Sequence, residues 1–450
     1  MEMAAAAAGA GAGGLVVVVF PWLAFGHMIP FLELSKRLAA WGHAVAFVST
    51  PRNLARLPPV PAHLSAHIRF VPLPLPAVEG LPEGAEVTSD LPPDKVELLK
   101  KAMDGLAAPL ASFLADAVVA GRRPDWIIID FCHHWVPPIA DQHKVPCAAF
   151  LIFHAAFMAF IGPRWTNDAH PRTKPEDFTV PACHPSGSPS RPPPSSSTTR
   201  PGGCSLTTSP AIPAEILLPG ATDDRNEDHG QSSSSGADGR QVLRWLDDQP
   251  PKSVIYVGLG SEAPLTLENI HELALGLELA GVHFLWALRK PAGTNNKQEL
   301  LPAGFEERTQ DRGVVCTGWV PQVKVLAHGA PTAFLTHCGW GSTIESFGFG
   351  LPLVMLPFLT DTPMIARAMA ERGIGVLVPR DGSDGSFDRD GVVVVVRRVM
   401  SEDEGKVFAT NAKKLKELVL DERCQEQYIH ELEEHLRRYK EARSSGDQLS

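Results

Sequence analysis

The feature that most constrains the fold is a repeated pattern, in which a short run of β-branched residues is followed by an amphipathic helix. Residues 15–20 read LVVVVF, which is typical of a strand buried on both faces. After a loop, Pro30 occupies the place of a first helical residue, apolar groups then recur at helical spacing, and Gly42 ends the helix. HAVAFVS (43–49) is a second strand. This strand–helix–strand order predicts a parallel sheet with right-handed crossovers.

The same unit recurs along both halves of the chain. The first half contains a predicted helix at 96–120 and further strands at 126–130 and 146–153. The second half contains a predicted helix near 266–280 and five strands, at 253–261, 283–288, 313–319, 333–337 and 352–357. A chain of 450 residues is too long for one ordinary core. We therefore expect an α/β protein with two doubly wound, Rossmann-like domains that bind ligands at the carboxyl ends of their strands.

Some stretches depart from this plan. Residues 181–240 are rich in Ser and Pro and have little apolar periodicity, which is typical of a linker. The run VVVVV (392–396) stays undecided, because its β-propensity favours a strand while the flanking Asp390 and Arg397 suit the ends of a helix. The expected organisation is a disordered tail at 1–14, a first domain at 15–180, an irregular segment at 181–240, and a second domain with terminal helices at 241–450.

Charge and cysteine content narrow the cellular context. The net charge is −10 and no block of Lys or Arg stands out, which disfavours nucleic acid and acidic membrane surfaces as partners. The seven cysteines form no C-x-x-C pair, so neither a disulfide framework nor a zinc site is expected. The N-terminus carries Glu2 and lacks a basic region, unlike a secretory signal. These features predict a soluble cytoplasmic protein without a membrane span.

The stretch HCGWGSTIES (337–346) places a glycine-rich turn between a predicted strand and a predicted helix. Free N–H groups at a helix start attract anions, and Gly339 and Gly341 allow a ligand to approach the backbone closely. Ser342 and Thr343 can cap the helix or donate to phosphate oxygens, and Glu345 can accept from ribose hydroxyls. On these mechanics alone, an ordinary tight turn explains the stretch about as well as a phosphate site.

Two neighbouring strand ends add groups suited to a nucleotide sugar. Trp319 could stack on a base, Gln322 could bond the base edge or a sugar, and Asp361 could accept from sugar hydroxyls. No G-x-G-x-x-G follows the first strand of either half, which disfavours NAD and FAD. The sequence also lacks the phosphate-binding loop of ATP enzymes and the G-x-S-x-G of esterases.

Residues 319–362 as a whole closely resemble the signature box of plant UDP-dependent glycosyltransferases. PWLAFGHMIPFLELSKRLAAWGH (21–43) and FVSTPRN (47–53) resemble the N-terminus of the same family. The resemblance is closest to the branch that extends sugars on terpenoid and flavonoid glycosides, and it covers roughly 15–180 and 240–440.

The resemblance implies a GT-B fold, in which two Rossmann-like domains face a cleft. It also implies metal-free, inverting transfer from a UDP-sugar that serves as co-substrate, with no further cofactor. The residues implied in donor binding run from the uracil to the sugar: Trp319, Val320 and Gln322 at the uracil; His337, Trp340 and Ser342 at the diphosphate, near Ser261; Glu345 at the ribose; and Asp361 with Thr362 at the sugar.

A base must take the proton of the acceptor hydroxyl. His27 lies just before the first helix, whose N-terminus disfavours a charged imidazole, and Asp130 ends a predicted strand. On pattern alone, a structural loop histidine and a turn or cap aspartate explain these positions, whereas the resemblance makes them the base and its partner. His133 and His134 are interpreted as pocket or packing residues. The candidate walls of an acceptor pocket are aromatic: Phe25, Phe131, Trp135, Phe153 and Phe157.

Three departures from the family pattern bear on function. Gly341 replaces the usual Asn, which predicts weaker donor binding because a buried hydrogen bond contributes about 0.5–1.5 kcal/mol. Thr362 replaces the final Gln, so glucose is the default sugar rather than a deduction. The resemblance fails over 182–239, and missing strands there would leave an unpaired sheet edge and remove a wall of the acceptor pocket.

Three hypotheses follow. The first is a monomeric transferase that moves a sugar, glucose by default, from a UDP-sugar to a hydroxyl of a small plant metabolite such as a flavonoid, a terpenoid or a glycoside of either. The second is a UDP-sugar-binding relic whose acceptor domain is incomplete. The third is an oxidoreductase of the same architecture, which the missing dinucleotide fingerprint disfavours.

Overall fold

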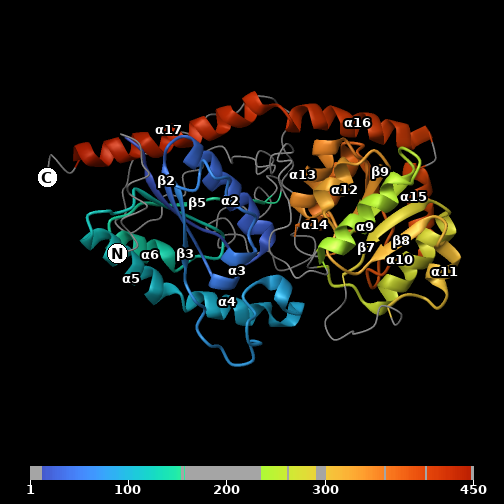
Figure 1. The fold of residues 1–450 in the computed structure, drawn as a ribbon, viewed down its shortest axis with the longest axis horizontal. Helices are drawn as coiled ribbons and strands as arrows, with labels where there is room; N and C mark the ends of the chain where they lie inside the picture. Colours follow the sequence, from blue (N-terminus) through green and yellow to red (C-terminus); the bar gives the residue numbers. More distant parts are fainter. Residues whose placement is uncertain are drawn as a thin grey trace.

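The computed structural model describes residues 13–153, 157, 235–260, 263–289, 300–358, 361–400 and 403–446. Its two parallel sheets form two α/β units, coloured blue to teal and green to orange in Figure 1, which confirms the α/β prediction. Most residues of the expected 181–240 segment lie outside the described part of the chain. Helix α9 (Ser235–Asp247) begins inside that segment and buries Val242 and Leu246.

The first sheet has the strand order β3-β2-β1-β4-β5 and all its pairs are parallel. The strands are β1 (Val16–Phe20), β2 (Ala44–Ser49), β3 (Ile68–Pro72), β4 (Trp126–Ile129) and β5 (Cys147–Ala149). The sequence pattern missed β3, which carries the exposed Pro72 and a half-buried Arg69. The strand order reverses between β1 and β4, and in open α/β sheets this switch point is where ligands bind.

The helices around this sheet differ from the expected ones at two points. They are α2 (Phe25–Ala40), α3 (Pro51–Arg56), α4 (Val96–Asp104), α5 (Ala107–Val119) and α6 (Val136–Gln142). Helix α2 begins five residues before Pro30, so Pro30 is not its first residue. A proline one turn into a helix removes only the bond to the carbonyl four residues earlier, which belongs to Gly26. The helix predicted over 96–120 is divided at Gly105, where a Cβ would lie 2.5 Å from Pro76.

Residues Val96–Val119 are long and apolar enough to cross a membrane by length and composition alone. In this fold, however, they form α4 and α5 and bury Leu99, Leu110 and Leu114 in the core beside the first sheet. The buried leucines share this core with residues of β1 and β4 such as Val18 and Ile127.

The second sheet has the strand order β11-β10-β9-β6-β7-β8 and is also parallel. Its strands are β6 (Val254–Gly258), β7 (His283–Ala287), β8 (Gly313–Cys316), β9 (Pro331–Thr336), β10 (Leu353–Met355) and β11 (Gly375–Leu377). The helices in this unit, besides α9, are α10 (Leu267–Ala280), α11 (Phe305–Thr309), α12 (Gln322–Ala327), α13 (Trp340–Phe349), α14 (Thr362–Glu371), α15 (Arg389–Met400) and α16 (Asp403–Val419). The switch point lies between β6 and β9, where α13 begins.

The undecided valine run lies in helix α15. Val392, Val395, Val396 and Val399 are buried at a spacing of three and four residues, which places them on one helical face against α10 and the sheet. Gly391 N–H donates to Asp388 Oδ1 at 2.7 Å at the start of the helix. Burial of one face thus overrides the β-propensity of valine.

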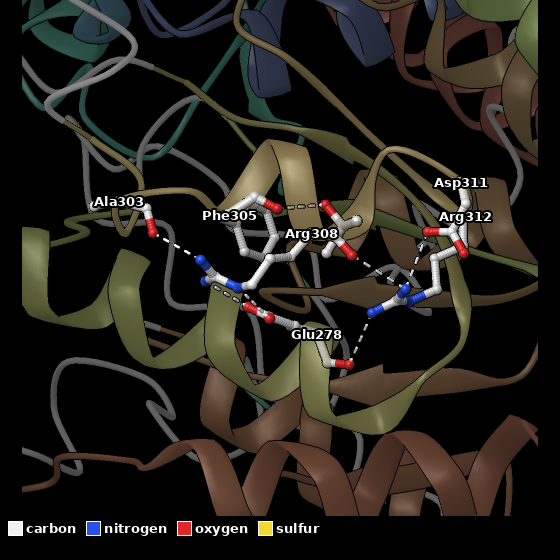
Figure 2. A network of polar contacts seen from close by, with 7 residues as sticks. Glu278, Ala303, Phe305, Arg308, Asp311 and Arg312 are labelled. Carbon is white, nitrogen blue, oxygen red and sulfur yellow. Dashed lines mark hydrogen bonds and ion pairs between the residues drawn. The ribbon is translucent and has the colours of Figure 1, made fainter.

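A polar network holds α10, α11 and the start of β8 together (Figure 2). Arg308 Nε and Nη2 donate to the two carboxylate oxygens of Glu278 at 2.6 and 2.9 Å, and its Nη1 donates to Ala303 O at 2.8 Å. Arg312, just before β8, donates to Glu278 O at 3.4 Å. The network therefore fixes the amino end of β8, whose carboxyl end leads to Trp319.

The last helix, α17 (Glu422–Gly446), returns to the first unit. Trp126 Nε1 donates to Leu436 O at 3.1 Å, and Lys440 pairs with Asp125 at 3.0 Å. Figure 1 shows α16 on the second unit and α17 running back along the first. The terminal helices, expected within 241–450 as part of the second domain, therefore join the two units.

Candidate active site

Two residues meet at the switch point of the first sheet. His27 lies in the first turn of α2, and Asp130 directly follows β4. His27 Nδ1 is 2.7 Å from Asp130 Oδ2. The backbone N–H groups of Trp22 and Phe131 donate to the same carboxylate at 3.0 and 2.8 Å. The carboxylate of Asp130 is therefore held from both sides of the switch point, and only 2% of the residue is exposed.

These contacts determine the protonation of the pair. Burial on its own would raise the pKa of Asp130, but the attraction and hydrogen bond of His27 and the two backbone N–H groups outweigh it, so the pKa lies below its ordinary value. Because the ionised Asp130 can only accept, the proton on the His27 ring lies on Nδ1. The lone pair of His27 is consequently on Nε2, which can act as a base.

Aromatic side chains line one side of His27. The ring of His27 is 5.5 Å from Phe131 and 5.7 Å from Phe153, and Phe153 is 5.2 Å from Phe157. Phe131 is 47% exposed. These three phenylalanines form an apolar wall beside the candidate base.

The structure places the other expected wall residues differently. Phe25 lies under the Arg56 guanidinium, 4.8 Å from its carbon, whereas Trp135 packs on Phe20 and His133 in the core. His133 is buried, and burial lowers its pKa to about 4. His134 is exposed.

In the second unit, His337 directly follows β9, and α13 begins three residues later. Its ring lies between two glycines, because a Cβ on Gly260 or on Gly339 would come within 2.5 Å of it. Burial lowers the pKa of His337 to about 4, so the ring is neutral at pH 7 and can donate one N–H. The N-terminus of a helix attracts negative charge, so the start of α13 is a candidate anion site next to this imidazole.

Gln322, the first residue of α12, links the predicted nucleotide residues. Its Nε2 donates to Glu345 Oε2 at 2.7 Å and to Ser342 Oγ at 3.2 Å. Burial raises the pKa of Glu345, and the hydrogen bond from Gln322 offsets part of that rise. The structure thus brings together three residues that the sequence assigned to uracil, diphosphate and ribose.

The remaining donor-site residues take varied positions. Trp319 is 55% exposed, and α9 packs against its ring through Gly239, where a Cβ would lie 3.3 Å from the indole. Val320 is half-buried next to it. Trp340 is buried in the core at the start of α13, so its backbone rather than its ring suits a phosphate. Ser261 lies outside the described residues.

The two residues expected to contact the sugar, Asp361 and Thr362, lie at the start of α14. Asp361 and Thr362 are 9% and 6% exposed. Thr362 Oγ1 accepts from Phe358 N–H at 3.3 Å. The Thr362 hydroxyl therefore ties Phe358 to the start of α14. A glutamine at this position has no hydroxyl oxygen on its Cβ that could accept this hydrogen bond.

A contact between the units aligns the two halves of the site. The guanidinium of Arg289, just past β7, donates to Ser89 O. The neighbouring Thr88 N–H donates to Leu23 O at 3.0 Å, just past β1. The carboxyl ends of the two sheets therefore face each other.

Comparison with known proteins gives the family. The UDP-glucoronosyl and UDP-glucosyl transferase family matches residues 237–422. UDP-glycosyltransferase 91D1 of Stevia rebaudiana is 37% identical over 462 residues, which cover 93% of this chain and 92% of the relative. The chain belongs to the plant UDP-glycosyltransferases. A soyasaponin III rhamnosyltransferase of Glycine max is 35% identical over 98% of this chain and 99% of its own length.

The solved structure of Arabidopsis thaliana UGT89C1 with UDP-L-rhamnose is similar to the glycosyltransferase described here. Its TM-score is 0.71 at 26% identity, with coverage of 94% of this chain and 100% of that one. The prediction of a GT-B fold is thereby confirmed, as is the prediction of a hexosyltransferase that uses a UDP-sugar as co-substrate.

Sequence reasoning missed two residues that contact members of the candidate site. The backbone N–H of Trp22 on Asp130 has no sequence signal, because it depends on the close approach of two strand ends. Tyr256 had one: it lies in the centre of a fully buried strand, and a buried tyrosine hydroxyl usually needs a partner. Its hydroxyl donates to Gln322 Oε1 at 3.3 Å.

Proposed function

We propose that this glycosyltransferase moves a sugar from a UDP-sugar to a hydroxyl of a small plant metabolite or its glycoside, with inversion at the anomeric carbon and without a metal ion. The observation that carries the proposal is the buried contact between His27 Nδ1 and Asp130 Oδ2 at the switch point of the first sheet. An imidazole whose Nδ1 is bonded to an ionised carboxylate is the arrangement that a general base requires.

In the proposed reaction, the acceptor hydroxyl gives its proton to His27 Nε2 as its oxygen attacks the anomeric carbon. The bond from that carbon to the diphosphate breaks on the opposite face, and the electron pair leaves with UDP. The imidazolium formed on His27 is stabilised by Asp130, whose two backbone hydrogen bonds keep its carboxylate ionised. Attack and departure on opposite faces give inversion.

The second unit would stabilise the leaving diphosphate. The N-terminal N–H groups of α13 and one N–H of His337 meet the negative charge that grows as the sugar bond breaks. Trp319 would stack on the uracil with Gln322 beside it, Glu345 would bind the ribose, and Asp361 with Thr362 would contact the sugar. Donors of this kind make metal-free departure of UDP chemically reasonable.

Glucose is the first sugar to test, since the family description includes glucosyl transfer. Rhamnose is the second, because the Glycine max relative is a rhamnosyltransferase and the UGT89C1 structure holds UDP-L-rhamnose. The aromatic wall of Phe131, Phe153 and Phe157 favours an acceptor with a flat apolar skeleton. We propose that the enzyme works as a cytoplasmic monomer.

The test uses purified protein without added metal and with a chelator. UDP-glucose and UDP-rhamnose are each offered with a panel of flavonoids, terpenoids and their glycosides, and mass spectrometry looks for one added sugar. Product in this panel supports the proposal. UDP binding without any product would favour the alternative function, a UDP-sugar-binding protein with an incomplete acceptor domain.

A further inference from the structure

The hydroxyl of Tyr256 contacts the proposed donor site from the interior of the second sheet. Tyr256 lies in the middle of β6, the central strand of the second sheet, and is 1% exposed. Its hydroxyl donates to Gln322 Oε1 at 3.3 Å. Because the residue is buried, it cannot touch a ligand bound at the surface of α13. Any effect of Tyr256 on the donor must pass through Gln322.

The ring of Tyr256 is held in place on two sides. It stacks on Phe334 of β9, with the rings nearly parallel at 13° and their centres 5.1 Å apart. Gly258 leaves room for it, since a Cβ there would lie 3.1 Å from the Tyr256 hydroxyl oxygen. Burial also raises the pKa of Tyr256, so the hydroxyl stays protonated and able to donate. The hydroxyl is thus a fixed donor.

A fixed donor determines which way the Gln322 amide faces. The Tyr256 hydroxyl donates to the amide oxygen of Gln322, so the amide nitrogen faces the other way. The nitrogen donates to Glu345 Oε2 at 2.7 Å and to Ser342 Oγ at 3.2 Å. The opposite orientation would place the amide oxygen against the Glu345 carboxylate, where two acceptors would repel.

We infer that Tyr256 is a positioning residue for donor binding, which orients Gln322 and through it Glu345 for the ribose of the UDP-sugar. The inference rests on the proposed function, because that proposal assigns Gln322 and Glu345 to the donor. Since these contacts serve binding rather than bond breaking, Tyr256 acts on the affinity for the donor and not on the chemical step.

The test is a double-mutant cycle read by calorimetric titration with UDP. Tyr256→Phe removes the hydroxyl and keeps the stacked ring, and we expect the Kd for UDP to rise by about three- to tenfold. In a Gln322→Met background the same change should have almost no further effect, because the partner is gone. With UDP-glucose and an acceptor, KM should rise while kcat stays the same. Tyr439→Phe, the same change on α17, is the matched control and should leave the Kd as in the parent.

UDP binding by Glu345→Ala tests the proposed donor site separately from the role of Tyr256. If Glu345→Ala weakens UDP binding and Tyr256→Phe does not, the inference is overturned and the donor site stands. The inference is also overturned if Tyr256→Phe weakens binding equally with and without Gln322. If the parent does not bind UDP, or Glu345→Ala binds it unchanged, the proposed donor site and this inference both fail.

A second measurement covers the case in which Tyr256→Phe does not fold. The chain has three tyrosines, so 3-fluorotyrosine labelling gives three fluorine signals, which Tyr428→Phe and Tyr439→Phe assign. We expect the Tyr256 signal to move in Gln322→Met and when UDP is added. If the chemical shift of Tyr256 stays the same in Gln322→Met and on addition of UDP, the inference is overturned.

Discussion

His27 Nδ1 and Asp130 Oδ2 lie 2.7 Å apart although 103 residues separate them in the sequence. The parallel pairing of β1 with β4 makes this possible, because it brings the carboxyl ends of both strands to one edge of the sheet. The position of the pair therefore depends on the fold of the first unit, which supplies both residues and the backbone N–H groups that bind Asp130.

Replacing Asp130 by Asn should lower kcat by about 10²- to 10⁴-fold, because a neutral amide neither fixes the Nδ1 proton nor stabilises the imidazolium. The Kd for UDP should be unchanged, since Asp130 lies in the first unit. Steady-state kinetics and titration with UDP measure the two effects. A kcat close to that of the parent would show that Asp130 has no part in the reaction.

Gly339 and Gly341 form a matched pair for the anion site. A Cβ on Gly339 would lie 2.5 Å from His337 Nε2, whereas a Cβ on Gly341 would meet no atom of the described residues within 4 Å, apart from its chain neighbours and the backbone of its own helix. Gly339→Ala should therefore displace His337 and raise the Kd for UDP by about tenfold or more, and Gly341→Ala should change it by less than about twofold. Equal effects would mean that the ring of His337 does not contribute to the site.

The open space at Gly341 also permits a gain of affinity. The family pattern has Asn here, and its side chain would enter space that the described residues beyond the neighbouring backbone leave open within 4 Å of the Cβ. Gly341→Asn should lower the Kd for UDP-glucose by about two- to tenfold through one added hydrogen bond. Gly341→Leu, similar in size but without the amide, is the control. Tighter binding by both variants would point to packing instead.

Glu345 should make donor binding depend on pH. Burial raises its pKa, and a ribose hydroxyl donates more strongly to the ionised carboxylate than to the protonated acid. Donor binding therefore favours the carboxylate, so the Kd should rise as pH falls through the raised pKa, by at most about tenfold per pH unit. Titration with UDP-glucose over about pH 5 to 8 measures it, with Glu345→Gln as the baseline. Parallel pH profiles for parent and Glu345→Gln would assign the dependence to another group.

Helix α17 should stabilise the first unit. Leu436 is 1% exposed, and its carbonyl accepts from Trp126 Nε1. Leu436→Ala should lower the free energy of unfolding by about 2–5 kcal/mol. Leu418→Ala on α16 is the control, because Leu418 is 70% exposed. Denaturant unfolding measures both, and equal stability of the two variants would mean that α17 is only loosely attached.

Strand content was predictable because both sheets are parallel and buried, so their strands are short apolar runs such as VVVVF and WIII. The hydrophobic pattern did not distinguish helix from strand in a β-branched run that is buried on one face only. Helix α15 has a buried valine face that composition cannot separate from a strand. Pro30 was misplaced because proline is tolerated in the first turns of a helix as well as at its first position.

The places of some candidate residues were predictable for the same reason, since polar residues at the carboxyl ends of parallel strands gather at one edge. Asp130 and His337 directly follow β4 and β9, and Gln322 begins the helix after β8. Residues that act from inside a strand or through the backbone were not predictable in this way. Tyr256 and the N–H of Trp22 are of this kind, and only three-dimensional contacts reveal them.

In the proposed reaction, His27 is the base of a sugar transfer from a UDP-sugar. The most direct test follows product formation from UDP-glucose by mass spectrometry in the parent and in His27→Ala, with UDP affinity measured in both. We predict product from the parent, none from His27→Ala, and the same Kd for UDP. Product formed by His27→Ala at the rate of the parent would contradict the account.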